Sequence, residues 1–442
     1  MKLVLPLRNW TSAFRFSTRY SALGTAFLLV FLVACSPAST ETLPTAVDLN
    51  AFSTNDAATQ QSQTADAAKV IATRNAQSTL NAPSTLPPTW TAAPQPTEPS
   101  AQPNPVSPTT VAATGTIYYI FNGDSIAMLN ADGSHEELIL AGSAPADLVL
   151  SPDGQWLAFT QKVSDTVREV FVMSLKTDGV PADQQYQPRQ VSCLGFANVV
   201  YPAWAADGHS LAFAASQALN GVLGIYTADP AGQCPVGNHQ RGLVQTQFKF
   251  ITGMAWDINN KYVYFTSTTV YAVDTANGTL YPPLTQTTGY GPDFDPVYRP
   301  NSTTLFYLKT GRDDQSATNG GSLSQVDTTA FATFPLQELR GTLLLALEFH
   351  FSGDGLLLVA SGTQDAFVQN MNVDSAVSVV QDAKFAPQAI LSPDAETVAY
   401  VDAGVGPKLV QQLWIVNRRG TNRQQLTSHK EGTISDMNWA AQ

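Results

Sequence analysis

The chain has 442 residues and a formal net charge of −12, and only 13% of its residues are charged. This balance argues against a nucleic-acid-binding protein, because affinity for a phosphate backbone depends on clustered lysine and arginine. The 29 glycines and 28 prolines favour a protein that is rich in turns. The length would hold two or three ordinary domains or one array of repeats.

Residues 1–34 have the pattern of a lipoprotein signal peptide. Four basic residues and no acidic ones precede an apolar run from Tyr20 to Ala34. That run is too short for a membrane-spanning helix and typical of a signal-peptide core. It ends in Leu32-Val-Ala-Cys35, which resembles the bacterial lipobox. The resemblance implies cleavage before Cys35 and lipidation of its sulfur, whereas a plain signal peptide that contains a cysteine is the alternative.

Cleavage would change both the charge and the location of the chain. Loss of the four basic residues takes the net charge from −12 to −16. Two or more acyl chains on Cys35 would make membrane anchoring stable. We therefore expect the chain to be exported and held on the outer face of the cytoplasmic membrane or on the outer membrane.

Residues 35–113 have the composition of a disordered stalk. From Ala82 to Thr110 there are nine prolines among Ser, Thr, Ala and Gln. Such a segment buries too little apolar surface to offset its chain entropy. Because a Pro-rich chain extends by up to ~3.1 Å per residue, this stretch could reach on the order of 90 Å from the membrane.

A unit of β-strands begins at Leu148. Its first apolar run is followed by the turn Ser151-Pro-Asp-Gly154 and by a second run that ends at Thr160, which predicts a hairpin. Val170–Leu175 predicts a third strand. One small antiparallel sheet cannot bury both of its faces alone, so the unit predicts an array.

Six copies of this unit begin between residues 147 and 388. Trp204 and Trp256 hold the same place in two copies 52 residues apart, a spacing typical of propeller blades. The folded part begins with three strands at residues 116–140 that lack a first strand, and it ends with Ile434–Trp439, a first strand without successors. Joining these fragments completes a seventh blade and removes the free sheet edges.

We therefore predict an all-β, seven-bladed β-propeller over residues 114–442, closed by pairing of the C-terminal strand with the N-terminal blade. Six blades is the alternative. The motif Ser151-Pro-Asp-Gly-Gln-Trp-Leu-Ala-Phe159, weaker at Ser352–Gly355 and Ser392–Asp394, resembles the WD-like repeats of the TolB propeller family. The resemblance implies the fold and not the function. A lipid anchor and stalk stand in place of TolB's extra N-terminal domain, so a role in the Tol–Pal system is not carried over.

The sequence contains no clear catalytic constellation. It has no Gly-x-Ser-x-Gly elbow, and Gly208-His-Ser-Leu-Ala212 lacks the second glycine. The five histidines are scattered without a His-x-x-x-His pair, so no zinc site is predicted. We predict a protein that is not an enzyme and that has no cofactor.

Cys193 and Cys234 are the two thiols besides Cys35, and both fall near the outer edges of consecutive blades. Outside the cytoplasm, two such cysteines are more often paired than free. A disulfide requires their Cα atoms to lie within ~7 Å of each other, so the free-thiol alternative stays open.

One position recurs three residues before the large residue of each inner strand, and we call these seven residues the column: Asp147, Tyr201, Gly253, Asp295, Glu348, Gln388 and Asp436. The alternation of side chains along a strand predicts that the column faces the central channel or its mouth. Its four carboxylates would attract a cation such as calcium, or a basic peptide segment. A solvated funnel is the other interpretation.

The aromatic residues at the foot of the inner strands also have two interpretations. Trp204, Trp256, Tyr298 and Trp439 could form a sugar-stacking platform, but their recurrence at one blade position favours a core between blades.

Taken together, these features predict an envelope scaffold that binds a protein or glycan partner and no nucleic acid. The alternative is an envelope hydrolase or lyase with its site at the channel mouth. The sequence leaves the oligomeric state open.

Overall fold

The computed structural model describes residues 113–235, 239–286, 292–309, 321–331, 335–336, 345–373 and 375–441. The predicted signal peptide, Cys35 and all of the stalk except Ala113 lie outside the described residues. Within the described ranges, no helix is long and apolar enough to cross a membrane. The helical segments described there are two 3-10 turns, η2 (Ala182–Gln184) and η4 (Thr328–Ala330).

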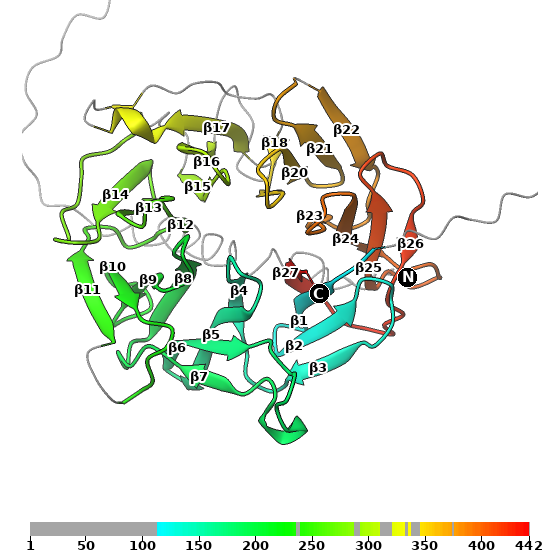
Figure 1. The fold of residues 1–442 in the computed structure, drawn as a ribbon, viewed down its shortest axis with the longest axis horizontal. Coiled ribbons are helices and arrows are strands. Elements are labelled where there is room, and N and C mark those ends of the chain that lie inside the picture. The colour runs from blue at the N-terminus through cyan, green and yellow to red at the C-terminus, as the bar shows by residue number, and fades with distance from the viewer. Residues whose placement is uncertain are drawn as a thin grey trace, which may run out of the picture. The chain divides into compact units, whose positions relative to one another are not determined.

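The strands form seven antiparallel sheets arranged as blades around a central axis (Figure 1). This confirms the seven-bladed propeller and excludes the six-bladed alternative. Blade 1 contains β27 (Ile434–Ala440), β1 (Thr116–Phe121), β2 (Ser125–Asn130) and β3 (Glu137–Leu140). Blade 2 contains β4 (Ala146–Leu150), β5 (Trp156–Ser164), β6 (Val167–Ser174) and β7 (Pro188–Gln190). Blade 3 contains β8 (Asn198–Trp204), β9 (Leu211–Ser216), β10 (Gly224–Ala228) and β11 (Gln240–Gln245).

The remaining four blades follow in chain order. Blade 4 contains β12 (Gly253–Trp256), β13 (Tyr262–Thr266) and β14 (Val270–Asp274). Blade 5 contains β15 (Asp293–Tyr298), β16 (Thr304–Lys309), β17 (Gly321–Asp327) and β18 (Leu345–Ala346). Blade 6 contains β19 (Glu348–Phe351), β20 (Leu357–Ser361), β21 (Ala366–Asn370) and β22 (Ser375–Val380). Blade 7 contains β23 (Ile390–Leu391), β24 (Thr397–Ala403), β25 (Gln411–Asn417) and β26 (Gln424–Gln425).

The ring closes as the two strand fragments predict. β27 pairs antiparallel with β1, with Ile117 opposite Trp439 and Thr116 opposite Ala440. The last strand of the chain thus becomes the inner strand of the blade that the first strands begin. Closure protects the backbone donors and acceptors of β1 that an open array would leave exposed.

The core lies between the blades. On β1, Ile117 and Tyr119 pack with residues of blade 7, whereas Tyr118 and Ile120 pack with residues of blade 2. Because both faces of a blade are covered, its central strands carry apolar runs such as Leu157–Phe159 in β5 and Val170–Met173 in β6, where neighbouring residues are buried on opposite faces.

The recurrent aromatic residues belong to this core. The indole nitrogen of Trp256 donates to the carbonyl of Ala203 at 3.0 Å, and that of Trp204 donates to the carbonyl of Val149 at 3.3 Å. Each indole therefore reaches the inner strand of the preceding blade. With Trp439 and Tyr298 also packed in or against clusters between blades, this supports the core interpretation.

Candidate functional site

The column residues lie within the first four residues of each inner strand or, for Gln388, just before it. Asp147, Tyr201, Asp295 and Asp436 are within β4, β8, β15 and β27, Gly253 and Glu348 begin β12 and β19, and Gln388 precedes β23 by two residues. Each inner strand contacts the inner strands of both neighbouring blades around the axis (Figure 1). The propeller therefore brings the seven positions to one end of the inner ring.

Most of the column has an uncommon backbone. Five of the seven residues have positive φ angles: Asp147 (55°), Tyr201 (55°), Asp295 (56°), Gln388 (42°) and Asp436 (52°). This left-handed conformation costs a residue other than glycine about 1–2 kcal/mol. At the four of these that lie within strands, the pairing register with the next strand shifts, which marks a β-bulge. A bulge redirects the side chain at that point of the strand.

The column is not a uniform ring of exposed carboxylates. Asp147 and Asp295 are buried, and Glu348 and Asp436 are half-buried. Half-buried Tyr201 and Gln388 lie between the acidic positions in the order of the blades.

Asp147 is held by side chains from the next two strands of its own blade, β5 and β6. Its Oδ2 accepts a hydrogen bond of 3.1 Å from Thr160 Oγ1, and Arg168 Nη1 donates to the same hydroxyl oxygen at 3.0 Å. Burial lowers the pKa of Arg168, and the charge of Asp147 acts against that change. The guanidinium therefore offsets part of the charge of Asp147, so the acidic character of the column rests mainly on its other carboxylates.

Blades 4 and 5 meet closely at the column. A Cβ atom on Gly253 would lie 2.6 Å from Pro296 Cδ, so a side chain there would collide with the neighbouring blade. The Asp295 amide donates to the carbonyl of Thr252 at 3.5 Å. At Gly253 and Asp295, therefore, the column residues also form the packing contact between the inner strands β12 and β15.

A buried threonine network next to this contact has no distinct signal in the sequence. Thr252 Oγ1 donates to the Asp293 carbonyl at 2.5 Å and lies 2.9 Å from Thr266 Oγ1. Thr285 Oγ1 donates to the Asp293 carboxylate at 3.5 Å. Because threonine is common in strands, its residue type alone does not predict such a network.

Glu169 is a buried carboxylate that the sequence analysis did not single out. It accepts hydrogen bonds from Ser192 Oγ and, at 2.6 Å, from the Gly195 amide. Burial raises the pKa of Glu169, although these hydrogen bonds oppose the change. An acid within β6, directly before its apolar run Val170–Met173, was the available signal. Its contacts hold the 192–195 turn in place, which is a structural role.

Glu136, Tyr119 and His429 form another polar cluster, next to the closure of the ring. His429 Nε2 lies 2.6 Å from Glu136 Oε1, and Tyr119 donates to the same oxygen. Burial would raise the pKa of Glu136, but the hydrogen bonds of His429 and Tyr119 outweigh it and hold that pKa below its usual value. The cluster links blade 1 to the β26–β27 connection.

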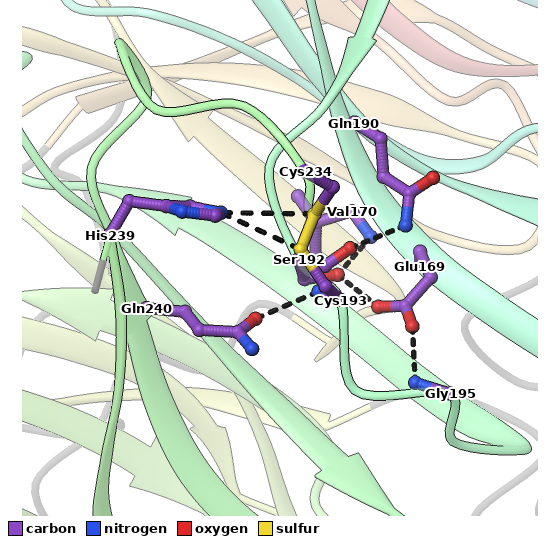
Figure 2. Close-up of a disulfide and its surroundings, with 9 residues drawn as sticks. All are labelled: Glu169, Val170, Gln190, Ser192, Cys193, Gly195, Cys234, His239 and Gln240. Carbon is purple, nitrogen blue, oxygen red and sulfur yellow. Dashed lines mark hydrogen bonds between the residues drawn. A yellow bond between two sulfur atoms is a disulfide. The ribbon is translucent and has the colours of Figure 1, made fainter. Parts of the chain in front are cut away.

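The structure joins Cys193 and Cys234 in a disulfide with a Cα–Cα distance of 5.9 Å. It ties the connection that leaves β7 to the loop between β10 and β11. Figure 2 shows the His239 ring pointing at the two sulfur atoms. Among the described residues, these three are the one group whose donor atoms lie close enough together to hold a metal ion. None of them belongs to the column.

The family and curated-protein comparisons find no match: no protein-family model and no curated protein is similar to this chain. Solved structures do match. A functionally unknown protein from Desulfotomaculum acetoxidans has a TM-score of 0.52 and 13% identity, covering 73% of this chain and 99% of its own.

Two further solved structures are of named proteins. An oligogalacturonate lyase in complex with manganese has a TM-score of 0.51 and 12% identity, covering 66% of this chain and 82% of its own. TolB from Acinetobacter baumannii has a TM-score of 0.44 and 15% identity, covering 74% of this chain and 66% of its own. This chain thus spans slightly less than two thirds of the TolB chain. At such identities, the two structures with TM-scores above 0.5 show that the chain shares its fold with them, and no more than the fold.

Proposed function

We propose that this chain is an extracytoplasmic, lipid-anchored binding propeller whose column binds a positively charged segment of an envelope partner. The observation that carries the proposal is the left-handed backbone shared by five column residues. Strained backbone conformations cluster at binding and active sites, where they fix the direction of a side chain. Their recurrence from blade to blade at one end of the inner ring supports a common role.

The charges favour a cationic partner. Glu348 and Asp436 are half-buried, so their carboxylates are partly in contact with solvent, and buried Asp295 lies on the inner strand next to that of Glu348. Low-dielectric surroundings focus such a field toward the opening of a cleft. The chain without its signal peptide would carry a charge of −16, which favours the approach of a basic segment at long range.

A pair of conservative substitutions tests the column. Glu348→Gln with Asp436→Asn removes two charges while keeping the shape of the side chains, and Asn tolerates a positive φ as Asp does. We expect the double variant to bind calcium and a panel of lysine- and arginine-rich peptides at least 10-fold more weakly than the unchanged protein. Isothermal titration at low and physiological salt measures this effect.

The matched control is Asp207→Asn with Glu396→Gln, two exposed acids in turns at the opposite ends of their inner strands. It removes the same number of negative charges and should leave binding unchanged. Equal binding by both double variants would contradict the proposal. Turnover of a polysaccharide or peptide library that the column variant loses would instead favour an envelope hydrolase or lyase.

Anchoring needs a separate test. The Cys193–Cys234 disulfide supports an extracytoplasmic location, because disulfides persist in oxidising compartments. We expect cells that express the chain to incorporate labelled palmitate into it, and Cys35→Ser to abolish that label. A label of equal strength in both proteins would contradict lipidation at Cys35.

A further inference from the structure

Cys193, Cys234 and His239 bring two sulfurs and an imidazole together at the outer edge between blades 2 and 3 (Figure 2). His239 Nε2 lies 3.7 Å from Cys193 Sγ and 3.8 Å from Cys234 Sγ. All three residues are half-buried, so they retain contact with solvent. The column and the proposed binding function involve none of them.

The separations between nitrogen and sulfur suit a tetrahedral metal ion. Zn²⁺ binds sulfur at about 2.3 Å and nitrogen at about 2.0–2.1 Å, which places tetrahedral ligands about 3.5–3.8 Å apart. The two S–N distances already lie close to this range. Only the two sulfurs would have to separate, from the bond length of about 2.05 Å to about 3.8 Å.

The backbone around the disulfide is held by contacts that do not depend on the S–S bond. The Cys193 amide donates to Gln240 Oε1 at 2.8 Å, and the Cys234 amide donates to the Gln190 carbonyl at 3.2 Å. The His239 carbonyl accepts from the Asp229 amide at 2.7 Å. Reduction would therefore leave both cysteines and the histidine in place.

Gly232 sets the position of the imidazole. A Cβ atom on Gly232 would lie 2.4 Å from His239 Cβ and 2.6 Å from its Cγ. The histidine can pack over this segment only because the glycine has no side chain. Gly232 is thus a positioning residue for His239.

We propose that Cys193, Cys234 and His239 form a redox-gated site for a thiophilic cation such as Zn²⁺. A dithiol reductant supplies two electrons and two protons to the disulfide and itself becomes a cyclic disulfide. The cation then displaces both thiol protons and binds two thiolates and the neutral Nε2 of His239, with water as its fourth ligand. The oxidised chain lacks the thiolates and has no affinity at this site.

Zinc titration of the full chain tests the proposal, with Cys35→Ser in every protein so that no third thiol takes part. One sample is left oxidised, and another is reduced with a phosphine that is then removed without oxygen. A fluorescent zinc chelator competes for the metal. We expect one Zn²⁺ per reduced chain and at least 100-fold weaker binding by the oxidised chain.

Substitutions assign the ligands. We expect Cys193→Ser with Cys234→Ser to abolish the binding, and His239→Ala or Gly232→Ala to weaken it at least 10-fold. His209→Ala, which removes an exposed histidine from a blade 3 turn, is the matched control and should bind as the unchanged chain does. Ellman titration of the unreduced Gly232→Ala protein should still find the two cysteines paired.

Three results would overturn the proposal. One is equal zinc uptake by the reduced and oxidised chains, and another is unchanged affinity in His239→Ala. The third is loss of the near-ultraviolet circular dichroism signal on reduction, because the site requires a folded dithiol form.

Discussion

Five column residues share a backbone conformation that residues with a side chain disfavour, although their side chains are as different as Asp, Tyr and Gln. A periodicity of two along each strand predicted the place of these residues but not this conformation. The β-bulge inserts a residue and breaks the alternation at the position of interest. The direction of the column side chains is therefore a property of the folded blade.

Substitutions at Gln388 isolate the cost of this conformation. Its φ is 42° and its side chain is half-buried. We expect Gln388→Val to be less stable than Gln388→Gly by about 1–2 kcal/mol, because a β-branched residue is strained where glycine is not. Urea denaturation measures the difference. A valine variant as stable as the glycine variant would show that the backbone at Gln388 relaxes at little cost.

Glu169 gives the molecule a pH dependence that can be checked. Burial raises the pKa of its carboxyl, so the native state holds this proton more tightly than the unfolded chain does. The free energy of unfolding should then fall as the pH rises above the unfolded value of about 4.3, until it passes the native pKa. The loss amounts to about 1.4 kcal/mol for each unit between the two pKa values.

Glu169→Gln removes this titration, so the stability of the unchanged protein relative to the variant should fall between pH 4 and pH 7. Denaturation by urea at several pH values measures the two curves. A difference between the proteins that stays constant with pH would contradict the assignment.

At the scale of elements, the turn between the first two strands of a blade is a built hydrogen-bond motif. Ser392 Oγ donates to Asp394 Oδ1 at 2.6 Å and accepts from the Thr397 amide at 2.9 Å. Ser151 and Ser352 make the same two contacts in their blades. The serine thus serves the turn, and its recurrence in the sequence has this structural cause.

Removing one such hydroxyl should be costly. Ser392 is buried, and Ser392→Ala leaves the Thr397 amide without its acceptor. We expect a loss of about 1–3 kcal/mol, the cost of an unsatisfied buried donor. Ser428→Ala, at an exposed position, is the control and should cost far less. If both variants unfold at the same urea concentration, the motif does not stabilise the blade.

At the scale of the whole molecule, β27 holds the two ends of the propeller together. Trp439 on this strand is buried among residues of blades 1 and 7, and its indole nitrogen donates to the Thr114 carbonyl at 3.0 Å. One side chain therefore contributes both core contacts and a hydrogen bond to the closure of the ring.

Trp439→Ala should open or weaken the closure. We expect a loss of about 3–5 kcal/mol, the usual cost of truncating a buried aromatic residue. Thermal unfolding by circular dichroism measures it, with Phe250→Ala as the control because that ring is 40% exposed. Closure through β27 would be unimportant if Trp439→Ala were no less stable than Phe250→Ala.

Sequence patterns were sufficient for the architecture. Turn residues and apolar runs are local signals, and their recurrence indicated the blades. The missing first strand before Thr116 and the unaccompanied strand at Ile434–Trp439 predicted the seventh blade and its closure, which the pairing of β27 with β1 confirms. These local patterns predict the architecture because each blade is built mainly from contacts between segments that are neighbours in the chain.

The chemistry of the sites depends on contacts that span many residues, and only the tertiary structure decided it. The column positions could be listed from the sequence, but the burial of Asp147 beside Arg168 and the close approach of Gly253 to Pro296 arise from packing within and between blades. Cys193 and Cys234 are 41 residues apart, and His239 joins them only because the β10–β11 loop folds back onto the edge of blade 2. Residue spacing could not predict that group of ligands, because the loop's course is set by hydrogen bonds to another blade.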